Sequence, residues 1–133
     1  MTANTANANQ TSPVTGNICR WLCGDAAVRL LRGDMAPLYM RVETKAGPVE
    51  TYYFVQQVRD EESTQCVGYR LHKEDANGKI VETHFVDITW GCTQPEAWVC
   101  DCKSARFGRS AKPCKHARGL AAALNRIGLL DVN

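Results

Sequence analysis

Residues 98–124 read WVCDCKSARFGRSAKPCKHARGLAAAL, and the cysteine and histidine residues in this stretch decide how the C-terminal part of the chain folds. They form two close pairs, Cys100 with Cys102 and Cys114 with His116. Three thiolates and one imidazole are a typical ligand set for a tetrahedral zinc ion. Because all four ligands would come from the protein, no coordination position stays open for water or substrate. We therefore expect one structural zinc ion as the only cofactor.

The two ligand pairs require different backbone conformations. In an extended chain, Cys100 and Cys102 point to the same face, with their Cα atoms about 6.6 Å apart. On a regular helix, by contrast, Cys114 and His116 would lie about 200° apart around the axis. We therefore expect Cys114 in the turn before a helix and His116 in the first turn. Pro113 favours this placement, because proline is tolerated where a helix begins.

The C-x-C…C-x-H pattern resembles the SWIM-type zinc finger over residues 98–127. An extended segment containing Trp98 precedes the first pair, and a basic loop with Gly108 and Pro113 precedes the second. The resemblance implies a small zinc module built from a β-hairpin and a helix. Such modules bind DNA or proteins and have no assigned catalytic role.

An alanine- and leucine-rich helix is predicted after the second ligand pair. Its apolar residues recur at helical spacing and would pack beneath the zinc site. These residues are Ala117, Leu120, Ala121, Leu124 and Ile127. Gly128 follows the last of them and is a plausible C-cap. Gly119 inside the helix indicates a close approach, either to the hairpin or to a partner.

Basic residues are concentrated around the second ligand pair. The chain carries a net charge of only +2, yet no acid occurs between residues 103 and 126. Such a run is typical of a phosphate-binding surface and predicts contact with DNA or RNA. Two simpler interpretations are that the cations offset the thiolate charge or form a solvated loop. Phe107 would either stack on a base or anchor the loop. The candidate contacts are Lys103, Arg106, Phe107, Arg109, Lys112, Lys115 and Arg118.

The seven cysteines are more consistent with thiols than with disulfides, because their number is odd. The N-terminal residues also lack the basic and apolar segments of a secretory signal. A reducing, cytoplasmic or otherwise intracellular compartment is expected. The cysteines outside the motif are interpreted mainly as small buried apolar residues, with a second metal site as the alternative. They are Cys19, Cys23, Cys66 and Cys92.

The rest of the chain predicts an α+β fold. Residues 1–16 are uncharged and poor in bulky apolar side chains, so we expect a disordered tail. Residues 17–133 would form one compact domain, with a helix and β-meander in 17–89 and the zinc module in 90–133. A helical pattern covers residues 18–33 and ends at Gly33. Alternating patterns in residues 38–44, 49–58, 64–73 and 79–88 predict four antiparallel strands, and Asn77-Gly78 is a strong hairpin signal.

The sequence contains no recognisable catalytic motif. His72 and His84 lie in strand patterns without a nucleophile nearby, and we expect His84 to face solvent. No enzyme activity, small-molecule substrate or membrane span is predicted. Two functional hypotheses follow. The first is a DNA- or RNA-binding zinc protein, and the second is a protein-interaction adaptor or accessory subunit of a nucleic-acid-processing complex.

Overall fold

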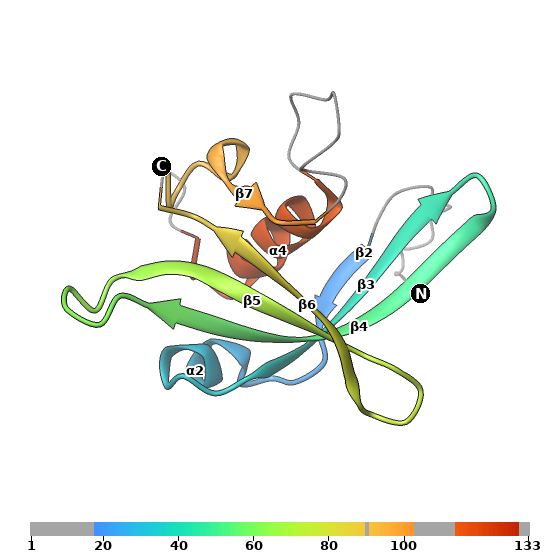
Figure 1. Ribbon diagram of the computed structural model, residues 1–133, viewed down its shortest axis with the longest axis horizontal. Helices are drawn as coiled ribbons and strands as arrows, with labels where there is room; N and C mark the ends of the chain where they lie inside the picture. Colours follow the sequence, from blue (N-terminus) through green and yellow to red (C-terminus); the bar gives the residue numbers. More distant parts are fainter. Residues whose placement is uncertain (1–17, 90, 103–113, 131–133) are drawn as a thin grey trace, which may run out of the picture.

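Six antiparallel strands form one sheet that curls into a half-barrel around the C-terminal helix (Figure 1). The computed structural model describes residues 18–89, 91–102 and 114–130. The strands lie in the sheet in their chain order, from β2 to β7. The elements are β2 (Ile18–Trp21), α2 (Ala26–Leu31), β3 (Ala36–Thr44), β4 (Gly47–Arg59), β5 (Cys66–Glu74), β6 (Ile80–Asp87), the 3-10 turn η1 (Pro95–Ala97), β7 (Val99–Cys100) and α4 (Lys115–Arg126).

The predicted four-stranded meander is confirmed as β3 to β6. Each strand pairs antiparallel with the next along the chain, as short connections require. The Asn77-Gly78 turn joins β5 to β6, and Gly78 has the positive φ of 80° that favours glycine there. Every second side chain therefore points toward the concave side of the sheet, which we call the inner face.

The prediction of a helix over residues 18–33 is wrong for the residues before Ala26. Residues Ile18–Trp21 form the edge strand β2, and only Ala26–Leu31 are helical. Pairing with β3 makes residues Ile18–Trp21 a strand instead of a helix. In this strand Cys19 is buried in the core and Arg20 is exposed. Gly33, with φ of 84°, follows the end of α2 as predicted.

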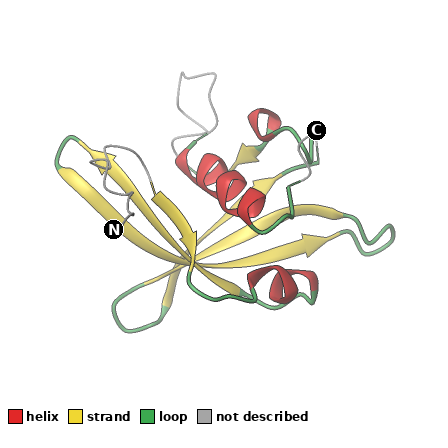
Figure 2. Cartoon of the chain, turned by 180° about the vertical axis from the view of Figure 1, so that it is seen from behind, coloured by secondary structure: helices red, strands yellow, loops and turns green. Residues whose placement is uncertain are grey.

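Helix α4 fills the inner face of the sheet (Figure 2). Its buried residues join one cluster with the inner-face residues of the meander, and Gly128 follows its end with φ of 75°. The predicted apolar face is therefore confirmed. The largest fully buried side chains come from both parts of the chain and are Leu30, Leu38, Val55, Leu71, Val86, Leu120 and Leu124.

Strand β7 extends the meander by one short strand. Cys100 pairs with Val86 and Val99 with Asp87, so the C-x-C segment continues directly from the sheet edge. The prediction was a separate zinc hairpin; in the part of the chain that the structure describes, β7 is instead the sixth strand of the main sheet. The tail predicted for residues 1–16 lies outside the described residues. Neither α2 nor α4 is long and apolar enough to span a membrane.

Candidate metal centre

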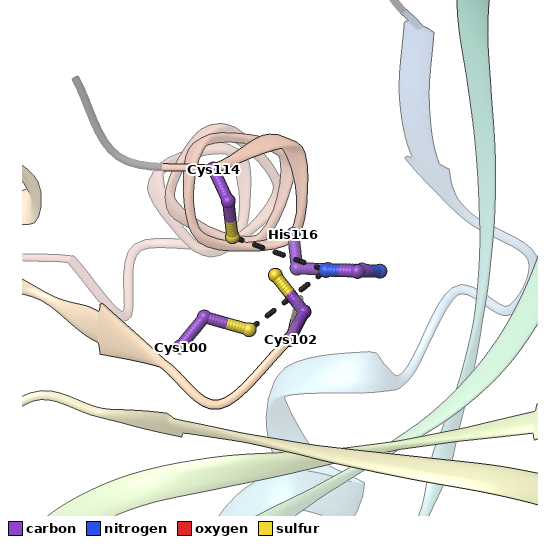
Figure 3. Close-up of side chains that lie close together, drawn as sticks. All are labelled: Cys100, Cys102, Cys114 and His116. Atoms are coloured by element: carbon purple, nitrogen blue, oxygen red, sulfur yellow. Dashed lines mark hydrogen bonds between the residues drawn. The ribbon is translucent and has the colours of Figure 1, made fainter. Parts of the chain in front are cut away.

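The four predicted ligands come together at the junction of β7 and α4 (Figure 3). Cys100 ends β7, and Cys102 follows two residues later. Cys114 is the N-cap of α4, in extended backbone, and His116 lies in the first helical turn. This is the placement that the i, i+2 spacing of the second pair required. All four residues are buried, whereas the chain's other two histidines, His72 and His84, are only partly buried.

The geometry fits one tetrahedral ion. All four ligand atoms lie within 4.8 Å of one another. His116 Nδ1 is 3.8 Å from Cys100 Sγ and 3.9 Å from Cys114 Sγ. Zinc–sulfur bonds of about 2.3 Å and zinc–nitrogen bonds of about 2.0 Å would separate sulfur from nitrogen by about 3.6 Å. The residues therefore fit zinc, with Nδ1 as the histidine ligand.

Tyr53 contacts the second ring nitrogen of His116, Nε2. Its hydroxyl lies 3.1 Å from His116 Nε2, on the side away from the sulfurs. With Nδ1 on a metal, the ring proton sits on Nε2 and is donated to the Tyr53 oxygen. Burial raises the pKa of Tyr53 to about 12, so the hydroxyl is uncharged at neutral pH. Such a partner fixes the ring orientation of a metal-binding histidine.

Asp101, between the two cysteines of the C-x-C pair, attaches this segment to β6. Its backbone N–H donates to the carbonyl of Phe85 at 3.2 Å. Its side-chain Oδ1 accepts from the Phe85 backbone N–H at 3.1 Å. The side chain thus continues the strand pairing one residue beyond β7. This explains how a two-residue strand keeps both cysteines in place.

His84 lies against the metal centre, and the prediction that it faces solvent is wrong. Its side chain is only 13% exposed, and its ring stacks on His116 with centroids 4.4 Å apart. Nε2 lies 2.8 Å from a Glu82 carboxylate oxygen, and Nδ1 lies 3.5 Å from Asp101. The two carboxylates therefore hold the ring from both sides, and His84 supports His116 from the sheet.

The thiols interact strongly with one another. A hydrogen bond from the Cys100 thiol lowers the pKa of Cys114 and raises the pKa of Cys100. His116 and the backbone N–H of Ala117 also lower the pKa of Cys114. Of these two residues, Cys114 is therefore the one that more readily carries negative charge. A thiolate at the helix N-terminus is the form that binds metal.

An open cleft of about 570 Å³ adjoins the centre on the inner face of the sheet. Its walls carry both signs of charge. Lys73 lies 3.9 Å from Glu82, which also contacts His84. Lys115 and Asp101 line the opposite part. Because the carboxylates offset the lysines, this cleft is a poor phosphate site.

Two of the predicted nucleic-acid contacts fall within the described residues. Lys115 and Arg118 are exposed on α4, and neither takes part in a salt bridge among the residues that the structure describes. The other five candidates, Lys103, Arg106, Phe107, Arg109 and Lys112, lie outside the described residues.

The remaining cysteines do not form a second centre. None of the chain's seven cysteines is in a disulfide. Cys19, Cys23, Cys66 and Cys92 join no group of potential metal ligands within the described ranges. Cys19 and Cys23 share no helical face, because Cys19 belongs to β2. Burial raises the pKa of Cys19 to about 12, so Cys19 is a neutral core residue.

No protein-family model, curated protein or solved structure matches this chain. The geometry of the four residues supports a buried Cys₃His centre suited to one metal ion.

Sequence reasoning missed the residues that support the ligands. His84 carried a usable signal, because it alternates with buried Val86 along β6 and so shares the inner face. Tyr53 carried none, since it contacts His116 across 63 positions of sequence.

Proposed function

We propose that this chain is a small intracellular zinc protein of the SWIM type that binds DNA or RNA beside a structural Cys₃His site. The observation that supports it is the acid-free basic run that begins at the second cysteine of the C-x-C pair and continues along α4. In this proposal the zinc ion stabilises the fold, and the chain is not an enzyme. The four protein ligands complete a tetrahedral shell, which is typical of structural zinc.

Charge argues for a phosphate ligand. Three thiolates around a divalent cation leave a formal charge of minus one. The basic run supplies far more positive charge than that, and its residues Lys115 and Arg118 are exposed. Excess cations on one surface attract polyanions and make their binding sensitive to salt.

A mobility-shift titration of the one-zinc protein tests the proposal. We expect DNA or RNA binding that weakens steeply as salt rises, because phosphate contacts release counterions. Reversing charge in an Arg106→Glu/Arg109→Glu variant should abolish that binding without changing the zinc content. Arg32→Glu is a matched control, because Arg32 is an exposed residue at the end of α2. Unchanged binding by the double variant contradicts the proposal.

A protein-interaction role is the second candidate, and α2 carries the observation that favours it. Val28 and Leu31 lie three residues apart on this short helix and are 51% and 52% exposed. Leu22, just before α2, is also largely exposed. Apolar side chains gathered on one exposed side are typical of a surface that another protein covers.

This adaptor hypothesis predicts a stoichiometric companion when the tagged chain is purified from its native cell. A Val28→Ser/Leu31→Ser variant should lose the companion while keeping its zinc. Val81→Ser serves as the control, because Val81 is equally exposed on β6. If no companion protein copurifies with the wild-type chain, this result counts against the adaptor role.

A further inference from the structure

A groove of about 170 Å³ runs between α4 and the strands β2 and β3. Its floor is apolar and is formed by Ile18, Met40, Val42, Gly119 and Ala122. Cys19 also lines it, and burial keeps this thiol neutral because its pKa is raised to about 12. The groove adjoins the charged cleft at Lys115, which lines both.

Gly119 allows the helix to approach the sheet closely at the groove. A Cβ atom at this position would lie 2.7 Å from Met40 Cε and 3.5 Å from Cys19 Sγ. The close approach predicted from a glycine inside the helix is therefore to β3 and β2. Because Gly119 has no side chain, the Met40 side chain packs directly against the helix backbone, and both residues line the groove.

Three cations border the groove. Lys115, Arg118 and Arg126 are all exposed and line it from α4. The salt bridges of the described ranges include none of them, and no carboxylate lines the groove. Arg126 lies eleven positions after Lys115, which is about 16 Å along a helix. A row of cations of this length suits a chain of several phosphates rather than one small anion.

The apolar floor favours a single strand over a duplex. In a duplex, the base faces are stacked inside and only the backbone and groove edges reach a protein. In a single strand, unstacked bases are free to contact apolar or aromatic side chains beside a basic groove. The charged cleft next to the metal centre lacks this combination, because Glu82 and Asp101 line it.

We propose that single-stranded DNA or RNA lies along this groove, with its phosphates on Lys115, Arg118 and Arg126 and a base against the apolar floor. This inference rests on the nucleic-acid function proposed above and specifies its substrate. It adds Arg126 to the contact surface, eight residues beyond the last contact proposed from the sequence. It also assigns Gly119 and Ala122 to the binding floor.

Fluorescence anisotropy with full-length, zinc-loaded protein tests the inference. The probes are labelled single-stranded oligo(dT) and oligo(U) and a mixed-sequence DNA duplex, each at two salt concentrations. We expect single strands to bind at least about tenfold more tightly than the duplex. Arg126→Gln should weaken single-strand binding about threefold to tenfold. It should also reduce the magnitude of the slope of log K against log salt concentration by about 0.7.

Ala122→Glu tests the floor directly, because Ala122 is exposed and its replacement adds a carboxylate inside the groove. We expect a loss of more than about tenfold, from like-charge repulsion and occlusion. Asn125→Glu is the matched control, since Asn125 is exposed on the same helix but does not line the groove. It should change binding by less than about threefold. Both variants should retain one zinc ion.

Three results would overturn the inference. Equal affinity for single strands and duplex, with no effect of Arg126→Gln and Ala122→Glu, would refute the groove but leave the proposed function standing. If polyglutamate displaces the labelled oligonucleotide as effectively as unlabelled oligo(U) of equal charge, the groove is a general anion site. Absence of binding to every nucleic acid by the one-zinc protein would refute both the inference and the proposed function.

Discussion

The meander from β3 to β6 and the Cys₃His region from β7 to α4 are stabilised by different interactions. Strand β4 has 13 residues and pairs along its length with two neighbours, whereas β7 has only two residues. Leu38, Val55 and Leu71 of the meander are fully buried apolar residues. The Cys₃His region instead buries three thiols and an imidazole. We therefore expect backbone pairing and apolar burial to stabilise the first region, and a bound metal ion to add to the stability of the second.

The two regions nevertheless share one core. Leu120 and Leu124 of α4 belong to the same buried cluster as Leu38 and Leu71 of the sheet. Burial of apolar surface between them contributes about 25 cal/mol per Å². Loss of the metal ion should therefore uncover the inner face of the meander as well as release α4.

Removing the metal centre should have the largest effect. We expect Cys114→Ser to lose its zinc and to lower the melting temperature by more than about 15 °C, measured by elemental analysis and circular dichroism. The reason is that structural zinc contributes about 10–16 kcal/mol of apparent binding energy in small zinc domains, comparable with a whole domain's stability. Cys92→Ser is the control, because Cys92 is an exposed thiol. A Cys114→Ser protein with one zinc and unchanged melting would mean that the ligand set is wrong.

A cavity in the meander should weaken the fold without emptying the metal site. Leu71 is fully buried in β5, so Leu71→Ala should lower the free energy of unfolding by about 2–5 kcal/mol in urea titrations. The folded variant should still contain one zinc ion per chain. Val81→Ala provides the comparison, because Val81 is mostly exposed. Loss of zinc from folded Leu71→Ala would show that the metal site depends on the apolar core of the meander, contrary to the difference proposed between the two regions.

The hydrogen bond between the regions should tune metal affinity. Tyr53→Phe removes the hydroxyl that contacts His116, so zinc affinity should fall about 10- to 100-fold in chelator competition. Tyr39→Phe removes a comparable hydroxyl, bonded to Glu50 at 2.6 Å, away from the metal centre. It should leave zinc affinity unchanged. Equal affinities for the two variants would show that Tyr53 does not orient the ligand.

The smallest effect is expected at the close contact between α4 and the sheet. Gly119→Ala gains about 1 kcal/mol of helix propensity but moves the flexible end of Met40. The free energy of unfolding should therefore change by less than about 1 kcal/mol. Gly119→Val should destabilise by about 1–3 kcal/mol through overpacking. Strong destabilisation by alanine would show that Met40 cannot shift, and denaturant titration distinguishes these outcomes.

The meander was predictable because its signals are local. Alternating side chains and the Asn77-Gly78 turn each determine structure within a few residues. The grouping of the four candidate ligands was predictable for a related reason, since residue type and spacing alone restrict the coordination geometry. The position of Cys114 at the N-cap of α4 follows from the same spacing argument.

The parts that sequence reasoning missed depend on contacts between distant residues. Residues 18–21 carry a helical pattern, but their pairing with β3 makes them a strand. The role of Tyr53 depends on the curl of the sheet, because the curl brings β4 close enough to α4 for Tyr53 to contact His116. Neither residue periodicity nor turn chemistry contains that information.

We propose that one zinc ion bound by three sulfurs and one histidine nitrogen joins α4 to the sheet. Zinc K-edge X-ray absorption on the purified full-length protein tests it most directly. We expect one zinc ion per chain, with three sulfur ligands at about 2.3 Å and one nitrogen ligand at about 2.0 Å. A folded protein without zinc, or a shell dominated by oxygen ligands, would contradict it.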